Sequence, residues 1–308
     1  MQAIVSGGQG RVARTDVAEP EPRPGHVVVE VAAFSINRGE TYQLEGPRRD
    51  WRPGKDLAGV VVHAAPDGSG PRVGARVVGH ADDSAWAERA LVPVSRLAEL
   101  PEEISFVTAA ALPLAGLTAL RLLRVAGPLP SRRVLFTGAS GGVGHYFVEL
   151  AAGQGALVTA VTGSTERGRR LTELGAIEVI DDVEQTLGPF EVAIESVGGA
   201  TTRAAWHRLE QHGLLIWIGQ ASRARPELDY FDWDGAMSVT IRKFNYLDST
   251  HTEADDLATL VRLVAGRHLH PELGLVEDWS RTAEAIAALV QRRVRGNAVL
   301  TIGTAHLP

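Results

Sequence analysis

The pattern of apolar and polar positions divides the chain into two kinds of structure. Up to about residue 112, short apolar and β-branched runs at 25–34, 57–64, 74–79 and 87–94 alternate with Gly- and Pro-rich turns. Many short strands separated by such turns predict a small β-barrel. From 108 to 125 the apolar positions follow helical spacing, and Pro113 and Gly116 are expected to break this helix into two pieces.

Beyond a linker at 127–130, apolar strands alternate with helices. Strands are expected at 133–137, 157–162, 177–181, 190–197, 213–219 and about 239–246. This alternation predicts a doubly wound parallel sheet and an α/β fold class. Two amphipathic helices follow at about 252–266 and 280–293, and a last strand at 296–302 is expected to return to the N-terminal barrel. The expected domains are therefore residues 1–117 with 248–308, and residues 118–247.

A glycine cluster stands between the first strand of the α/β region and the helix after it. Gly138, Gly141, Gly142 and Gly144 follow the apolar run 134–137 and precede a helix expected at 143–152. Strand, glycine turn and helix are typical of a dinucleotide site, where the helix N-terminus faces a pyrophosphate. A glycine turn without a ligand is the alternative, and the further strands and helices favour the nucleotide. The predicted contacts are Ser140, Gly141, Gly142 and Val143.

The end of the second strand of the sheet indicates which nucleotide binds. NAD enzymes usually place an acidic residue there for the ribose hydroxyl, whereas this chain has Gly163 and Ser164. Ser164 can donate a hydrogen bond to a 2′-phosphate, and Arg167 can pair with it. NADPH is therefore expected rather than NADH. Glu166, beside Arg167, argues in the other direction, and Arg170 is expected to be solvated.

Composition narrows the classes of function. The chain of 308 residues has a net charge of −6, which argues against a nucleic-acid-binding surface. It contains no cysteine, which excludes disulfides, thiolate catalysis and cysteine-ligated zinc. No apolar run approaches the ~20 residues of a membrane span, and the N-terminus does not resemble a signal peptide. A cytoplasmic protein without membrane or nucleic-acid partners is expected.

Four motifs occur in a fixed order along the chain: FSINRGETYQLEG at 34–46, PGKDLAG at 53–59, AAALPLAGLTA at 109–119 and GASGGVG at 138–144. Together they resemble the zinc-independent quinone oxidoreductase branch of the medium-chain dehydrogenase/reductase superfamily. The resemblance implies a Rossmann domain together with a GroES-like β-barrel catalytic domain. It also implies a homodimer in which a late strand such as 239–246 pairs across a two-fold axis.

Zinc-dependent members of this superfamily resemble alcohol dehydrogenases and differ from this chain at their metal ligands. They have a Cys in the segment matching 34–38 and a His directly before the acidic residue of the second motif. Here that segment has no Cys, and Lys55 stands before Asp56. Zinc needs three converging protein ligands. His26, His63 and His80 are scattered and are expected to be ordinary surface or partly buried polar residues, so no metal site is predicted.

Without zinc, a conjugated acceptor suits hydride transfer best, since its developing charge spreads and hydrogen-bond donors can stabilise it. The resemblance places Asn37 beside the nicotinamide and the substrate carbonyl, with a structural Asn in a turn as the alternative. Tyr42 would donate a proton or wall the pocket, or simply pack. Thr118 would lie near the nicotinamide ribose or carboxamide, or serve as a helix-start hydroxyl.

Further residues are assigned by the same resemblance. Arg38 is expected near the mouth of the site or in solvent, and Trp86 in the pocket wall or on the surface. Both depart from the family pattern and suggest a specialised substrate. Asn297 stands where members of the family commonly have a basic residue in their final GKxVL motif. The rest of the expected cofactor contacts are Val197, Gly219, Gln220, Ala221, Phe244, Asn245 and Asn297.

These observations predict an NADPH-dependent oxidoreductase that transfers hydride to a quinone or to a conjugated alkene or carbonyl. One alternative is a pathway-specific enoyl or enone reductase that acts on a biosynthetic intermediate such as a polyketide. Another, of a different class, is a non-catalytic NADPH-binding protein with a structural or redox-sensing role.

Overall fold

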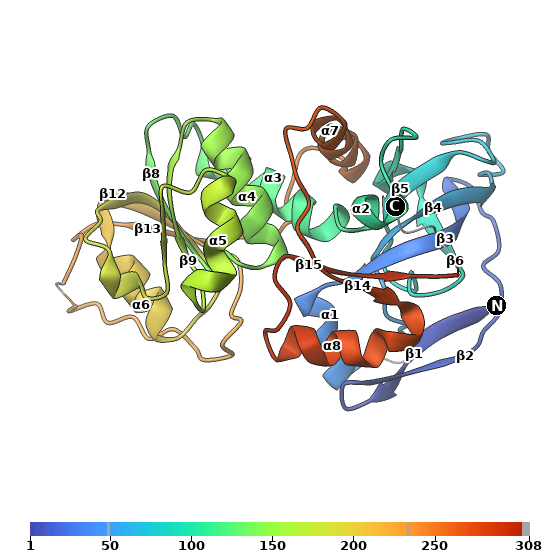
Figure 1. Ribbon diagram of the computed structural model, residues 1–308, viewed down its shortest axis with the longest axis horizontal. Coiled ribbons are helices and arrows are strands. Elements are labelled where there is room, and N and C mark those ends of the chain that lie inside the picture. The colour runs from blue at the N-terminus through green and yellow to red at the C-terminus, as the bar shows by residue number, and fades with distance from the viewer. Residues whose placement is uncertain (48–49, 233, 304–308) are drawn as a thin grey trace. The chain divides into compact units, whose positions relative to one another are not determined.

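The computed structural model describes residues 1–47, 50–232 and 234–303. The chain divides into two compact units (Figure 1). The first unit comprises Met1–Leu117 and the chain from Thr250, and the second comprises Thr118–Ser249. The first unit is therefore discontinuous in sequence, and each unit has a sheet of its own.

The first unit is built on a seven-stranded sheet. Its strands pair in the order β14-β15-β3-β4-β5-β7, and β6 also pairs with β3, while β1 and β2 form a separate hairpin. The bounds are β1 Gln2–Gly8, β2 Arg11–Asp16, β3 His26–Ile36, β4 Asp56–His63, β5 Arg76–His80, β6 Arg89–Pro93, β7 Leu97–Glu99, β14 Leu273–Asp278 and β15 Asn297–Thr301. β15 pairs antiparallel with β3 and places Leu300 opposite Phe34. The predicted return of the last strand to the N-terminal sheet is confirmed.

Helices of the first unit are α1 Arg38–Glu45, α2 Phe106–Ala110, α7 Glu253–Ala265 and α8 Thr282–Val290, with α3 Pro113–Ala126 crossing the division between the units. The predicted break at Pro113 is confirmed, and proline suits the first helical position because its missing N–H is not needed there. The predicted break at Gly116 is wrong, because α3 continues through it. A Cβ on Gly116 would lie 2.9 Å from Leu260 of α7, so this glycine permits close helix packing.

The core of the first unit contains Trp86, which is fully buried. Its ring stacks on Phe34 with centroids 5.6 Å apart, and its Nε1 donates to the carbonyl of Ser35 at 3.1 Å. Gly54 has φ +112°, and a Cβ there would lie 2.2 Å from the backbone nitrogen of Trp86. The expectation of Trp86 in a pocket wall or on the surface is therefore wrong, since this tryptophan is a packing element of the core.

The second unit is a six-stranded sheet in the order β10-β9-β8-β11-β12-β13, with every neighbouring pair parallel. Its strands are β8 Arg133–Thr137, β9 Leu157–Val161, β10 Glu178–Ile180, β11 Phe190–Glu195, β12 Leu209–Trp217 and β13 Thr240–Lys243. Its helices include α4 Gly142–Gly153, α5 Thr165–Glu173 and α6 Ala200–His207. The predicted doubly wound parallel sheet is confirmed. Its order reverses between β8 and β11, and ligands of such sheets bind at the carboxyl ends of the strands at that point.

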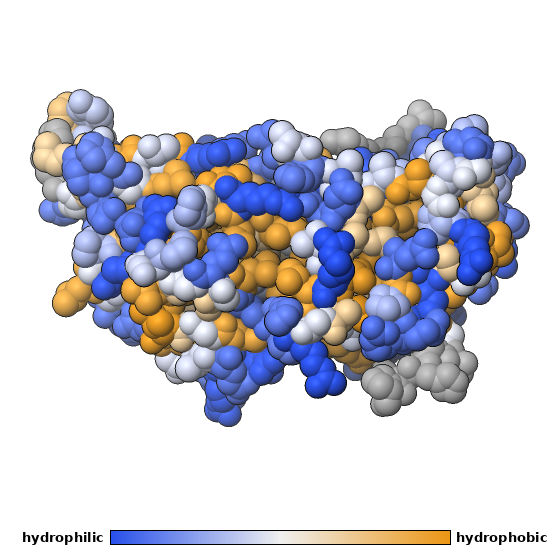
Figure 2. Space-filling view, turned by 90° about the horizontal axis from the view of Figure 1, so that it is seen from above, coloured by the Kyte–Doolittle hydropathy of each residue, from blue (hydrophilic) through white to orange (hydrophobic). Residues whose placement is uncertain are grey.

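The surface is mixed in character. On the face drawn in Figure 2, hydrophilic residues cover much of the area and hydrophobic residues show between them. Among the helices of the described ranges, none has both the length and the apolar character needed to span a membrane.

Candidate functional site

The glycine turn after β8 has a backbone that needs its glycines. Gly138 has φ +70°, and a Cβ on it would lie 2.4 Å from Ser196 Oγ. A Cβ on Gly144 would lie 2.2 Å from the Ala139 carbonyl oxygen, so Gly144 lets α4 pack close against the turn. Gly141 is the N-cap of α4 and has room for a Cβ, whose nearest atom would be 3.6 Å away. The turn therefore presents a helix N-terminus at the carboxyl end of β8, which is a favourable place for a phosphate.

Three residues predicted to contact phosphate lie together at the ends of β8 and β9. Ser164 is the N-cap of α5, and its hydroxyl accepts from the Arg167 N–H at 3.4 Å. The Arg167 Nε donates to Ser140 Oγ in the glycine turn, also at 3.4 Å. The structure thus brings Ser140, Ser164 and Arg167 into one polar group at the carboxyl edge of the sheet.

Glu195 at the end of β11 organises the neighbouring loop and was missed by the sequence reasoning. It is fully buried and accepts hydrogen bonds from Thr137 Oγ1 at 3.1 Å, Val197 N–H at 2.8 Å and Gly198 N–H at 3.0 Å. Val197, a predicted cofactor contact, is therefore fixed beside the glycine turn. The sequence did contain a signal for Glu195, namely an acidic residue at the end of an apolar strand. A carboxylate buried at such a position must find hydrogen-bond donors.

The loops after β12 and β13 continue this edge of the sheet. Ala221 N–H donates to the Ser196 carbonyl at 2.9 Å, which ties Gly219, Gln220 and Ala221 to the loop after β11. Phe244 N–H donates to the Trp217 carbonyl at 2.9 Å directly after β13. The remaining predicted residues of this unit are Asn245, whose Oδ1 accepts from Leu247 N–H at 3.1 Å, and Thr118, which is buried on α3.

A second cluster, in the first unit, centres on Asp56 at the start of β4. This side chain is fully buried. Its Oδ2 accepts from Ser35 Oγ at 2.8 Å and from Asn37 Nδ2 at 2.7 Å. Its Oδ1 accepts from the Leu114 N–H at 3.1 Å and lies 2.8 Å from His80 Nδ1. Four hydrogen-bond partners around one carboxylate hold it in place, and the bond to Nδ2 fixes the side-chain amide of Asn37.

The Asp56 cluster corrects one expectation. His80 was expected to be a surface or partly buried polar residue, but it is 1% exposed and contacts Asp56. That expectation is wrong, because the His80 ring is buried against a partner distant in sequence. The Arg38 Nη2 donates to the Leu289 carbonyl of α8 at 2.9 Å, and a place for Arg38 near the mouth of the site stays a prediction.

Helix α1 begins at Asn37 and carries a buried acid. Asn37 is its N-cap, and its N–H donates to Glu40 Oε2 at 2.8 Å, which is half of a capping box. Glu40 is 1% exposed, and burial, reinforced by the negative charge of Asp56, raises its pKa to about 8. Tyr42, the other predicted catalytic residue on α1, is 37% exposed.

Asn297 is a predicted cofactor contact that lies in the first unit. It is buried at the start of β15, and its N–H and its side-chain Nδ2 both donate to the Glu272 carbonyl, at 2.8 Å and 3.1 Å. These bonds hold the entry of the strand. A role for Asn297 in cofactor binding stays a prediction.

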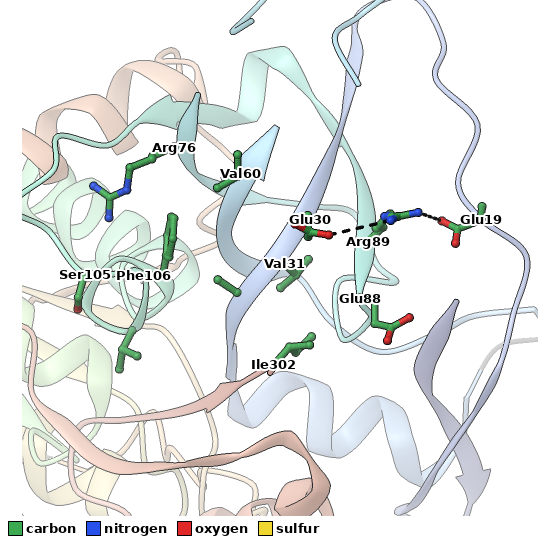
Figure 3. A pocket seen from close by; sticks show the side chains of 12 residues that line it. Glu19, Glu30, Val31, Val60, Arg76, Glu88, Arg89, Ser105, Phe106 and Ile302 are labelled. Atoms are coloured by element: carbon green, nitrogen blue, oxygen red, sulfur yellow. Dashed lines mark hydrogen bonds and ion pairs between the residues drawn. The ribbon is translucent and has the colours of Figure 1, made fainter. Parts of the chain in front are cut away.

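The first unit also has a pocket of about 710 Å³ whose lining shares no residue with the Asp56 cluster. Figure 3 shows Arg89 between Glu19 and Glu30, with ion-pair distances of 3.0 Å and 4.0 Å. On the other side Arg76 lies over the Phe106 ring at 4.6 Å. Arg89 is paired with two glutamates of the pocket, Glu88 accepts from the Gln2 N–H at 2.7 Å, and Arg76 donates to the Ile104 carbonyl at 2.6 Å. Because these charges already have protein partners, we place the candidate chemistry at the Asp56 cluster. Across the described residues, no group of three or more His, Cys, Asp or Glu side chains is arranged to hold a metal ion.

Comparisons with known proteins agree with this architecture. Residues 23–102 match the family model of the alcohol dehydrogenase GroES-like domain, which confirms the predicted GroES-like unit, and residues 174–300 match a family model described as zinc-binding dehydrogenase. A quinone oxidoreductase from Salmonella typhimurium is 32% identical over 233 residues, which are 70% of this chain and 71% of that protein. The chain belongs to the quinone oxidoreductase family. This family is a branch of the medium-chain dehydrogenase/reductase superfamily, as the four motifs predicted.

Two further proteins match over most of the chain. The human quinone oxidoreductase is 29% identical over 88% of this chain and 87% of its own length. A mycobacterial protein solved in complex with NADPH is 25% identical, covers 98% of this chain and 99% of its own, and superposes with a TM-score of 0.88.

Proposed function

We propose that this protein is an NADPH-dependent oxidoreductase that transfers hydride to a quinone or a conjugated alkene or carbonyl and uses no zinc. The observation that carries the proposal is the group of Ser140, Ser164 and Arg167 at the carboxyl ends of β8 and β9. Membership of the quinone oxidoreductase family supports the reaction class.

The residues of the second unit fit a phosphorylated dinucleotide. The N-terminus of α4 would receive the pyrophosphate. Arg167 and Ser164 would receive the 2′-phosphate, and the sequence from Val161 to Ser164 offers no carboxylate that would repel it. The mycobacterial relative that was solved with NADPH supports this choice of nucleotide. Bound NADPH would supply the hydride, and the chain would supply binding, orientation and stabilisation of charge.

The substrate side of the proposal depends on Asn37. Its amide donates one hydrogen to Asp56, which fixes the plane of the amide group. The amide nitrogen has a second hydrogen, which would donate to the oxygen of a quinone or enone as that oxygen gains charge. A fixed donor of this kind suits conjugated acceptors, because their charge is delocalised.

The ligand chemistry of the first unit supports a reaction without zinc. The position that holds a Cys in zinc-dependent relatives has none, and both Asp56 oxygens are already occupied by four donors. Zinc would need three ligands free to converge. The Asp56 cluster therefore does not fit a catalytic zinc ion, although residues 174–300 match the family model described as zinc-binding dehydrogenase.

The test compares Arg167→Ala with Arg169→Ala, a nearby exposed arginine of the same helix. Titration of each variant with NADPH and NADH gives four affinities. A charge-assisted bond to phosphate is worth about 1.5–3 kcal/mol, so we expect Arg167→Ala to weaken NADPH binding about 10- to 150-fold and to leave NADH unchanged. Equal losses for both nucleotides, or equal effects of the two variants, would remove the phosphate assignment.

A further inference from the structure

The Glu40 carboxyl is buried in a way that a structural cap does not require. Its Oε2 accepts from Asn37 N–H at 2.8 Å, but its Oε1 is fully enclosed and has no hydrogen-bond partner. A capping box is served equally well by Glu or Gln at this position. At this buried position an ionised carboxylate costs more free energy than an amide, because burial of a carboxylate charge is strongly unfavourable. A carboxyl group that keeps its proton avoids this cost.

The surroundings of Glu40 favour the protonated form. Asp56 faces four hydrogen-bond partners beside Glu40, and its negative charge opposes a second one on Glu40. Burial and this repulsion raise the pKa of Glu40 to about 8. The Asn37 N–H, the positive charge of Lys55 and the Lys55 backbone N–H act in the opposite direction and lower that pKa. Of the other titratable side chains on these elements, Arg38 donates to the Leu289 carbonyl and His80 contacts Asp56.

Glu40 and Asp56 both accept hydrogen bonds from Asn37. Asn37 donates its backbone N–H to Glu40 and its side-chain amide to Asp56. An ionised Glu40 would attract donors more strongly and would repel Asp56, so the amide of Asn37 would lose its fixed orientation. Groups whose ionisation is strongly perturbed by burial and a specific charge are concentrated at functional sites.

We propose that Glu40 is a positioning residue whose protonated carboxyl holds Asn37 in place for the substrate, so that reduction slows once Glu40 ionises. This inference rests on the proposed function, since it assumes that Asn37 faces the acceptor. It adds a residue that touches neither substrate nor cofactor and acts through Asn37.

The experiment measures kcat for NADPH-dependent quinone reduction across neutral and alkaline pH. For the wild-type protein we expect kcat to fall above pH about 8, approaching tenfold per pH unit. Glu40→Gln keeps the bond to the Asn37 N–H and cannot ionise, so its kcat should stay level through the same range. The matched control, Glu45→Gln, changes an exposed glutamate at the other end of α1 and should keep the wild-type profile. An alkaline fall that persists unchanged in Glu40→Gln would overturn the proposal.

A second measurement does not depend on turnover. Infrared difference spectra of the wild-type protein should show the carbonyl band of a protonated carboxylic acid at neutral pH, lost as the pH passes about 8. Glu40→Gln should lack this band, and a wild-type protein without it at neutral pH would contradict the proposal even if the variant failed to fold. If the protein oxidised no NADPH but showed the band, the proposed function would fail while the protonation of Glu40 would stand.

Discussion

The replacement Asp56→Asn tests whether one buried carboxylate organises the candidate substrate site. An amide has one oxygen and one NH2 group, whereas each oxygen of Asp56 now faces two donors. In one orientation the NH2 group meets Ser35 and Asn37, and in the other it meets His80 and the Leu114 N–H. The Ser35 hydroxyl and the His80 ring can each accept from the new NH2 group, so the stranded donor is the Asn37 amide in the first orientation and the Leu114 N–H in the second.

The magnitude follows from the count of unpaired donors. A buried donor left without a partner costs about 1–3 kcal/mol, so the variant should lose about 1–3 kcal/mol of unfolding free energy. A loss near the middle of that range lowers the unfolding temperature by about 4–8 °C in a unit of this size. The Leu114 N–H belongs to the backbone and cannot rotate away, so the new NH2 should turn toward Asn37 and displace its amide. We therefore expect kcat to fall as well.

Thermal unfolding followed by circular dichroism gives the stability change, and steady-state kinetics give kcat. Asp56→Glu keeps the charge and both acceptor oxygens and is the matched control. If Asp56→Asn were as stable and as active as the wild type, the assignment of Asp56 as the organising group would be refuted.

Three further predictions concern single positions. Gly144→Ala should disrupt the glycine turn and abolish nucleotide binding, while Gly141→Ala, where a Cβ has room, should fold normally; calorimetric titration with NADPH separates the two. Burial raises the pKa of Glu40 from its usual 4.5 to about 8. The wild-type protein should therefore lose unfolding free energy as the pH rises across that interval, on the order of 5 kcal/mol in all. Urea unfolding should show no such loss for Glu40→Gln. Asn37→Ala should lower kcat about 10²- to 10³-fold with little change in NADPH affinity, and an unchanged kcat would exclude Asn37 as the donor.

Much of the second unit could be predicted from the sequence because its strands are continuous apolar runs. Buried parallel strands have this pattern, and glycines mark the turn after β8. The residues at its carboxyl edge could be placed for the same reason, since Ser140, Ser164 and Arg167 follow directly from strand ends. Their contacts with a nucleotide, the homodimer and the cytoplasmic location stay predictions.

The first unit was harder to predict because its signals are weak or long-range. Helix α1 has eight residues and few apolar positions, and the capping pair Asn37 and Glu40 was the one local sign of it. Strand β2 is mostly exposed and polar, so it has no alternating pattern. The Asp56 cluster depends on partners 24 and 58 residues away, His80 and Leu114, which no local pattern brings together.

The central claim is that a phosphorylated nicotinamide nucleotide supplies the reducing power to a conjugated acceptor without a metal. The most direct measurement is the oxidation of NADPH by purified protein with a quinone, before and after removal of metal ions by a chelator. We predict quinone-dependent oxidation of NADPH, faster than that of NADH, with a rate unchanged by the chelator. Activity that is lost on chelation and restored by zinc, or no oxidation of either nucleotide, would contradict the account.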